Sequence, residues 1–405
     1  FSEAARRPWC FKAEDDMGRL TQPRRFVSIC LIMSFLMAGY LRQTMSLRSL
    51  LGSHFSGKGK QSLAARTLLR QASSSTEALA TQSVKVIYSP QFLDHKAPTF
   101  HVECPERLIE IEAKLKGLQG GITWAAPSGE SHSERISMVL EMAKRIHTEE
   151  YINELESISQ RGGGGLDFDT FVHPKSFRVA LLAATAWCDA VDSVLKDSEP
   201  AFSLSRPPGH HATKTVGMGF CLMNFAVIAA KYALEAYPGK CKRVAIFDWD
   251  VHHGNGVENL VKDFPEIRYC SVHEAGNYPM TGPADFKGPL GNILNIPLAA
   301  ETDWRAYRAP FEDKVVPFLE EFEPDLVIVC AGYDALSSDY MSNFELFSRD
   351  YGKMSKVLRA QFGHRVMWGL EGGYDVAALP DAVHETLRPY LDPAGAETYD
   401  FDRNN

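Results

Sequence analysis

Short apolar runs that alternate with helical patterns constrain the fold of this 405-residue chain more than any other feature of its sequence. Several of these runs are apolar almost throughout, which is typical of parallel strands covered by helices on both faces. Helical patterns lie between them, at 177–197, 226–236 and 311–322. This alternation predicts a doubly wound α/β domain with a central parallel sheet. The predicted strands lie at 84–90, 201–205, 244–250, 267–273, 292–298, 325–334 and 365–374.

Residues 1–82 differ in composition from the rest of the chain, so we expect a boundary near residue 83. The first 80 residues carry a net charge of +7, and from Met17 to Thr76 there are nine Lys and Arg residues but no Asp or Glu. A basic, serine-rich segment of this kind is typical of an organelle transit peptide. We therefore predict an N-terminal targeting or disordered extension over 1–82, a folded domain over 83–392 and a C-terminal tail over 393–405.

Because of the apolar segment 26–41, the cellular compartment to which the extension directs the protein stays open. Its 16 uncharged residues are fewer than the roughly 20 that a membrane helix needs. Three interpretations remain, namely a plastid or mitochondrial address, a secretory signal or marginal membrane anchor, and an extension without an address. The organelle interpretation accounts best for the basic composition, with cytoplasm or nucleus as the alternative location.

The remainder of the chain is acidic, and its cysteines form no recognisable pairs. Residues 81–405 carry a net charge of −15, which argues against direct binding to the phosphates of nucleic acid. The eight cysteines include no CxxC pair and no zinc-finger spacing. We therefore interpret them as reduced thiols of a protein that is not secreted.

Polar, glycine-containing sequences end four of the predicted strands. They read RPPGHHA at 206–212, DWDVHHGNG at 248–256, AGYDA at 331–335 and EGGYD at 371–375. In a parallel sheet the carboxyl ends of the strands share one edge, where such sheets bind their ligands. The sequence therefore predicts one functional site built from four strand ends.

Three residues at these strand ends are suited to a metal ion. Asp250 and His252 are two residues apart in extended chain, so their side chains face the same side. Asp334 follows another strand, and two carboxylates with one imidazole suit a catalytic zinc ion with open coordination positions. The alternative is a buried histidine paired with an aspartate for structure alone. The matching position of Asp334 favours zinc.

Two further motifs supply groups for proton transfer and oxyanion binding. His210 and His211 follow two prolines and a glycine that preset a turn, and adjacent imidazoles suit proton transfer near neutral pH. Tyr374 follows two glycines, and its phenol can donate a hydrogen bond to a developing oxyanion. The alternative for the two histidines is a surface loop, and Tyr374 standing alone would more often be a packed tyrosine. Beside a metal they predict metal-assisted hydrolysis of an amide.

The whole set of motifs resembles the zinc-dependent histone deacetylase family, most closely its class II and bacterial branches, which include acetylpolyamine amidohydrolases and acetoin-utilisation proteins. The resemblance covers residues 84–392 and is carried by RPPGHHA, GFCLMNF, DWDVHHGNG, YPMTG, AGYDA and EGGYD. It implies an arginase/deacetylase fold, a single domain with a parallel sheet of about eight strands. It also implies Zn²⁺ on Asp250, His252 and Asp334, an acid/base pair of His210 and His211, and Tyr374 as oxyanion donor.

Supporting residues and substrate contacts are implied as well. Asp248 matches the carboxylate that holds His210, and Asn255 matches the partner of His211, where some members have Asp. A neutral partner leaves His211 less basic than a carboxylate would. The implied substrate-binding residues are Gly219 and Phe220 in an acyl-lysine tunnel, Asp169 at its rim, Arg107 below the metal and Met341 beyond the third ligand. The resemblance also implies a potassium site that uses Ser271, Val272 and the backbone of Asp248, Asp250 and His252.

The motifs leave the substrate class open. Family members deacetylate lysine in proteins, acetylpolyamines or other small amides. Some polyamine-selective members carry a glutamate in the loop after the third metal ligand, whereas this chain has Met341 there and no glutamate before Glu345. We therefore expect hydrolysis of N-acetyl-lysine in proteins, with a small N-acetyl amide as the alternative.

Two other functional classes fit the sequence less well. An arginase-like binuclear hydrolase needs additional bridging carboxylates, whereas His253 stands where one is wanted. A non-catalytic acyl-lysine binder would usually have lost a metal ligand or a proton carrier, and every such residue is present. The sequence carries no indication of the oligomeric state.

Overall fold

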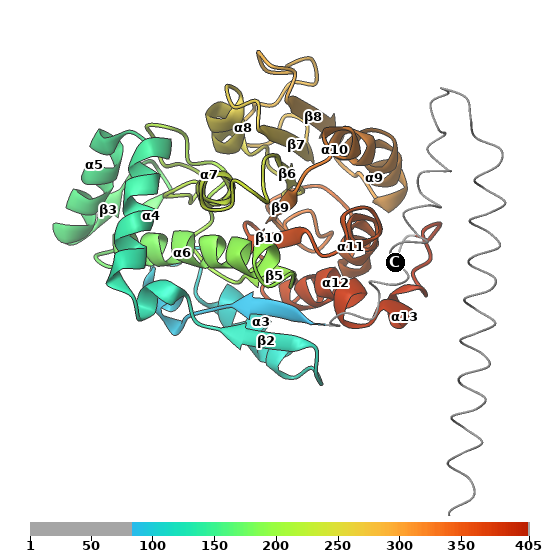
Figure 1. Ribbon diagram of the computed structural model, residues 1–405, viewed down its shortest axis with the longest axis horizontal. Helices are drawn as coiled ribbons and strands as arrows, with labels where there is room; N and C mark the ends of the chain where they lie inside the picture. The colour runs from blue at the N-terminus through green and yellow to red at the C-terminus, as the bar shows by residue number, and fades with distance from the viewer. Residues whose placement is uncertain (1–82, 404–405) are drawn as a thin grey trace, which may run out of the picture. The chain divides into compact units, whose positions relative to one another are not determined.

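One parallel sheet organises residues 83–403, which are the residues that the computed structural model describes. The sheet has eight strands in the order β2-β1-β5-β10-β9-β6-β7-β8, and all neighbouring strands are parallel (Figure 1). This confirms the predicted α/β class. The strands are β1 (Val84–Ile87), β2 (Ile122–Ala125), β5 (Ala201–Ser203), β6 (Val244–Asp248), β7 (Ile267–Glu274), β8 (Ile293–Leu298), β9 (Leu326–Ala331) and β10 (Val366–Leu370). A separate antiparallel pair joins β3 (Gly164–Gly165) to β4 (Phe171–Val172).

Helices cover both faces of the sheet. Adjacent residues of a strand point to opposite faces, and in β10 the ring of Trp368 packs on Tyr390 of α12 (Leu379–Leu391), whereas Gly369 lies against Trp187 of α6 (Ser176–Leu195). These contacts place α6 and α12 on opposite sides. The remaining α-helices are α3 (Glu106–Lys116), α4 (Ser133–Ile146), α5 (Glu149–Gln160), α7 (Phe225–Ala236), α8 (Asn255–Val261), α9 (Trp304–Pro310), α10 (Val316–Phe322), α11 (Ser348–Phe362) and α13 (Pro393–Ala396).

The core explains why the central strands are apolar throughout. Every residue of β6, β9 and β10 is buried, and α6 buries most of its length against the sheet. Strands covered on both faces have no solvent side that would need polar residues. The helical pattern at 311–322 differs slightly from expectation, because Phe311–Val315 forms a π turn before α10. Pro317 lacks the N–H that would bond to the Asp313 carbonyl in a regular α-helix.

The two ends of the chain differ in what the structure describes. Within 393–405, predicted as a C-terminal tail, residues 393–403 pack on the domain, since Tyr399 is buried and the Trp304 Nε1–H donates to the Phe401 carbonyl at 2.9 Å. No helix among the described residues is long and apolar enough to cross a membrane. The predicted extension over 1–82, including the apolar segment 26–41, lies outside the described residues.

Candidate active site

The three predicted metal ligands meet at the carboxyl edge of the sheet. Asp250 and His252 follow β6, and Asp334 follows the neighbouring strand β9. Their ligand atoms all lie within 4.8 Å of one another. His252 Nδ1 lies 3.1 Å from Asp250 Oδ1 and 3.0 Å from Asp334 Oδ2, and all three side chains are buried.

The chemistry of this donor set fits a divalent cation. Burial and the nearby charge of Asp250 raise the pKa of Asp334 to about 6. Burial opposes the charged form of His252, but the carboxylates of Asp334 and Asp250 hold the pKa of His252 well above its usual value. Two buried carboxylates this close are costly unless a positive charge compensates them. Two oxygen ligands and one nitrogen ligand are a set that zinc accepts.

Backbone amides fix one oxygen of each carboxylate. Gly372 N donates to Asp250 Oδ2, and Val251 N donates to Asp334 Oδ1, each at 2.9 Å. A Cβ atom on Gly372 would lie only 2.3 Å from Asp334 Oδ2 and 2.7 Å from Asp250 Oδ2. Position 372 therefore requires glycine, because its backbone runs directly beside the two carboxylates.

The tandem histidines lie beside this ligand set and have different partners. His210 Nδ1 lies 3.1 Å from Asp248 Oδ2, and His211 Nδ1 lies 2.8 Å from Asn255 Oδ1. The two ring centroids are 4.0 Å apart. His210 Nε2 is 3.8 Å from Asp250 Oδ2, so the free nitrogen of that ring faces the predicted metal site.

Their surroundings separate the protonation states of the two histidines. Burial disfavours charge on both rings. At His210 the carboxylates of Asp250 and Asp248 outweigh burial and raise the pKa. At His211 burial and the positive charges of His210 and His252 hold the pKa well below its usual value. Neighbouring groups with pKa values displaced in opposite directions are typical of an acid/base pair.

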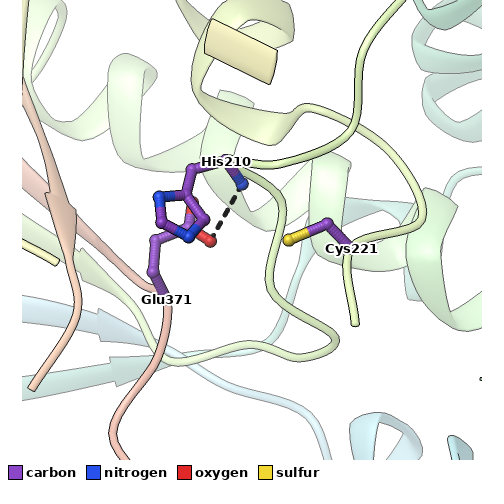
Figure 2. Close-up of side chains that lie close together, drawn as sticks. All are labelled: His210, Cys221 and Glu371. Atoms are coloured by element: carbon purple, nitrogen blue, oxygen red, sulfur yellow. Dashed lines mark hydrogen bonds between the residues drawn. The ribbon is translucent and has the colours of Figure 1, made fainter. Parts of the chain in front are cut away.

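A buried glutamate, Glu371, supports the histidine pair from the end of β10 (Figure 2). Its Oε2 accepts hydrogen bonds from Gly209 N at 2.6 Å and from His210 N at 3.1 Å. Burial raises the pKa of Glu371 to about 7, against the opposing charge of His210. No pattern in the sequence distinguishes Glu371, although it is the first residue of the EGGYD motif.

Cys221 lies beside Glu371 and His210, and the potential ligand atoms of the three are within 4.8 Å of one another. Asp248 already holds the His210 ring, and two amides hold Glu371 Oε2. The Cys221 thiol donates to the Gly219 carbonyl at 3.3 Å. We therefore interpret this group as hydrogen-bonded support for the histidine loop. All six cysteines within 83–403 are free thiols.

Tyr374 packs between an arginine and an aromatic ring. The Arg107 guanidinium carbon lies 4.9 Å from the centroid of the Tyr374 ring. The Phe220 and Tyr374 rings pack edge to face, with their centroids 5.7 Å apart. Arg107 Nε donates to the Gly373 carbonyl at 2.6 Å, and Arg107 Nη2 donates to the Glu371 carbonyl. Arg107 is completely buried. The structure thus places this predicted substrate-binding residue behind Tyr374, where it holds the tyrosine loop.

The geometry agrees with the comparison to known families. The family described as the histone deacetylase domain matches residues 101–389 of the chain. The chain belongs to the histone deacetylase family.

Relatives and solved structures agree with this membership. An uncharacterized protein of Synechocystis sp. is 47% identical over 310 residues, which cover 76% of this chain and 99% of the relative. Histone deacetylase 14, chloroplastic, of Arabidopsis thaliana is 34% identical over 286 residues, which cover 64% of this chain and 67% of the relative. The crystal structure of the HDA15 HD domain superposes with a TM-score of 0.69 at 30% identity, covering 78% of this chain and 93% of that one. Both the predicted family and the arginase/deacetylase fold are confirmed, and the chain is a hydrolase of the deacetylase type.

Three further residues border this candidate site. A Cβ atom on Gly219 would lie 2.4 Å from His211 Cδ2 and 2.9 Å from Tyr278 Cε1. The Tyr278 ring is 5.1 Å from the His211 ring and 6.3 Å from the His252 ring. Gly219 and Tyr278 therefore border the site on one side, and Phe220 borders it beside Tyr374. Tyr278 begins the YPMTG motif, but its position in the sequence alone does not indicate a role.

Two other residues predicted to bind the substrate are Asp169, at the rim, and Met341, beyond the third ligand. Asp169 is exposed, and its carbonyl lies 3.0 Å from His101 Nε2, whose ring packs on Phe220 at 4.7 Å. The Met341 carbonyl accepts from Asn277 Nδ2 at 3.2 Å, which links the loop after Asp334 to the loop of Tyr278. Both residues thus lie on loops that adjoin the site.

The residues predicted to bind potassium are buried next to β6. Ser271 pairs in register with Asp248 in the neighbouring strand, and its Oγ lies 2.9 Å from His273 Nδ1. Val272 follows it on β7 and is completely buried. The potassium site stays a prediction.

Proposed function

We propose that the chain is a zinc-dependent deacetylase that hydrolyses the acetyl amide of N-acetyl-lysine in proteins. One observation carries the proposal, namely that the ligand atoms of Asp250, His252 and Asp334 lie within 4.8 Å of one another while His210 Nε2 lies 3.8 Å from Asp250 Oδ2. A zinc ion held there would act as a Lewis acid. It would polarise both the amide carbonyl and a water molecule. All other roles fall to side chains of the chain itself.

His211 is the proposed general base. Its Nδ1–H donates to Asn255 Oδ1, so its Nε2 is left to accept a proton. Its lowered pKa keeps the ring neutral at physiological pH. His210, held in the protonated form by Asp248 and Asp250, provides positive charge and a proton at Nε2 for the leaving amine.

Tyr374 is the proposed oxyanion donor. Burial raises the pKa of its phenol well above the usual value, so the hydroxyl keeps its proton. A neutral phenol can donate a hydrogen bond to the oxygen on which negative charge develops. Phe220, Gly219 and Tyr278 would exclude water from the acyl chain of the substrate.

The absence of a carboxylate at Met341 favours an uncharged acyl-lysine side chain over a polyamine. A second candidate is a small N-acetyl amide, because the exposed carboxylates of Asp167 and Asp169 would also suit a cationic small molecule. The test measures acetate release by the full zinc-loaded chain from an acetyl-lysine peptide, an acetylpolyamine and an aromatic N-acetyl amide. Preference for the peptide supports protein deacetylation, and preference for either small amide replaces it.

We also propose a plastid location and a structural potassium ion at Ser271 and Val272. The chloroplastic relative from Arabidopsis and the basic composition of residues 1–82 support the plastid location. Residues 1–82 fused to a fluorescent protein should direct it to plastids, and a mitochondrial or cytosolic signal would contradict this. Exchanging K⁺ for Na⁺ should lower the thermal stability of the full chain, because a potassium ion at Ser271 and Val272 would stabilise the folded state.

A further inference from the structure

We propose that Asp339 is a positioning residue for Tyr374, which it holds in place through the backbone of the tyrosine loop. Nothing in the sequence motifs assigns a role to Asp339. The inference rests on the proposed function, because it assumes that the Tyr374 phenol acts on the substrate.

The carboxylate of Asp339 accepts three backbone hydrogen bonds. Its Oδ2 accepts from Tyr374 N at 2.5 Å and from Asp375 N at 3.0 Å, and its Oδ1 accepts from Met341 N at 3.0 Å. The side chain is only 4% exposed. Hydrogen bonds to a buried carboxylate are among the stronger ones in proteins.

The tyrosine loop needs such an anchor because two glycines precede Tyr374. Gly373 has a φ of +110°, a conformation that glycine adopts readily and other residues do not. Gly372 N is held by Asp250, and the Gly373 carbonyl is held by Arg107. The amide of Tyr374 itself is held by Asp339. Asp339 therefore fixes the residue whose side chain must point at the substrate.

The same carboxylate ties two loops together. Asp339 lies five residues after the predicted ligand Asp334, in the loop that also contains Met341. Closing this loop onto Tyr374 would place the oxyanion donor relative to the ligand set. A misplacement of about 1 Å in such a constellation can cost about 10²-fold in rate. The rival reading is that Asp339 only shapes the loop of Asp334 and so acts on metal binding.

The experiment is a double-mutant cycle on the zinc-loaded full chain. Wild type, Asp339→Ala, Tyr374→Phe and the double variant are compared for kcat and KM on the substrate that wild type hydrolyses best. Asp339→Ala should lower kcat by about 10²-fold with little change in KM. In the Tyr374→Phe background the same change should cost less than about threefold, because the group that Asp339 positions is already gone.

Two further variants control for folding and for general loss of a buried carboxylate. Asp339→Asn retains one acceptor oxygen for the amides of Tyr374 and Asp375, and it should retain more activity than Asp339→Ala. Asp350→Asn alters another buried carboxylate, which accepts from Phe347 N and from Lys353 Nζ, each at 2.8 Å, and shares no hydrogen-bond partner among the described residues with Asp339, so it should leave kcat unchanged. Zinc content per chain should be the same in wild type and in both Asp339 variants.

The outcomes separate the proposal from its rivals. Equal losses from Asp339→Ala in both backgrounds, or loss of zinc in Asp339→Asn, would overturn the positioning role in favour of metal binding. An active wild type with unchanged kcat in Asp339→Ala would overturn the inference alone. Crystal structures of wild type and Asp339→Ala give a reading independent of turnover, since Tyr374 should be displaced in the variant. An unmoved Tyr374 contradicts the inference, whereas a wild type inactive on all three amides contradicts the proposed function.

Discussion

His211 donates a hydrogen bond to a neutral amide, Asn255, over 2.8 Å between Nδ1 and Oδ1. The adjacent His210 bonds instead to the carboxylate of Asp248 at 3.1 Å. Two imidazoles whose centroids are 4.0 Å apart thus receive different electrostatic support. The anionic partner stabilises the charged ring, and the neutral partner leaves the other ring free to act as a base.

Asn255→Asp should therefore shift the acid limb of the pH–rate profile to higher pH. A half-buried carboxylate next to the ring stabilises the imidazolium form of His211 and so raises its pKa, and the base is then lost by protonation at a higher pH than in wild type. We expect a shift of about one pH unit or more in kcat/KM measured between pH 5 and 9. Asn259→Asp is the matched control, since it adds the same charge at an exposed position of the same helix. An unchanged profile in Asn255→Asp would remove His211 from the role of base.

Tyr374→Phe should lower kcat by about 10²–10³-fold, which is the usual cost of losing one oxyanion donor. The ring and its contacts with Arg107 and Phe220 remain in the variant, so KM and thermal stability should change little. Steady-state kinetics on an acetyl-lysine peptide checks the prediction. Turnover close to that of wild type would show that the phenol has no part in the reaction.

Much of this architecture could be predicted from the sequence, because buried parallel strands are apolar throughout. β6, β9 and β10 appear inside their predicted ranges, and their polar ends assemble one site. The edge strand β2 was not predicted, because its sequence, ITWA, is only four residues long and half-buried. A short edge strand of this kind has no distinctive pattern.

The site divides in a similar way. That Asp250, His252 and Asp334 come together could be predicted, because the residue types that can bind a metal are few and these three follow strand ends. Asp339 and Glu371 could not, because each acts by accepting hydrogen bonds from backbone amides. Any aspartate or glutamate in a loop has the same capacity, and which amide it reaches depends on the folded path of two loops. Tyr278 was missed for the same reason, since its ring meets His211 only through the loop geometry.

Removal of the metal should abolish activity and lower stability together. A ligand that binds only the folded state stabilises it by about 2.7 kcal/mol at a concentration a hundredfold above its Kd. Zinc should therefore raise the Tm of the chelator-treated wild type. Asp334→Asn should abolish this rise, because it removes one of the two carboxylates proposed to bind zinc, whereas Asp350→Asn should retain it. A zinc-dependent rise of equal size in Asp334→Asn would place the ion elsewhere.

The stability of the domain should also fall at mildly acid pH through His147. This buried ring lies at the end of α4, where its Nδ1–H donates to the Thr213 carbonyl at 2.7 Å and its Nε2 accepts from Asn224 N at 2.9 Å. A second proton would face the Asn224 N–H, so the folded state requires the neutral ring. Burial accordingly lowers the pKa of His147 to about 4, although the bond to Thr213 opposes this.

The sign of the effect follows from this lowered pKa. Between pH 6.5 and pH 4 the unfolded chain binds a proton that the folded chain does not, so stability is complete above about pH 6.5 and is lost as the pH falls toward 4. At pH 5 the loss from this one group is roughly 2 kcal/mol. His147→Gln should lower stability at pH 7 but reduce the further loss between pH 7 and pH 5 by about that amount. Urea denaturation of both proteins at the two pH values measures the difference, and equal losses would show that His147 titrates alike in the folded and unfolded chains.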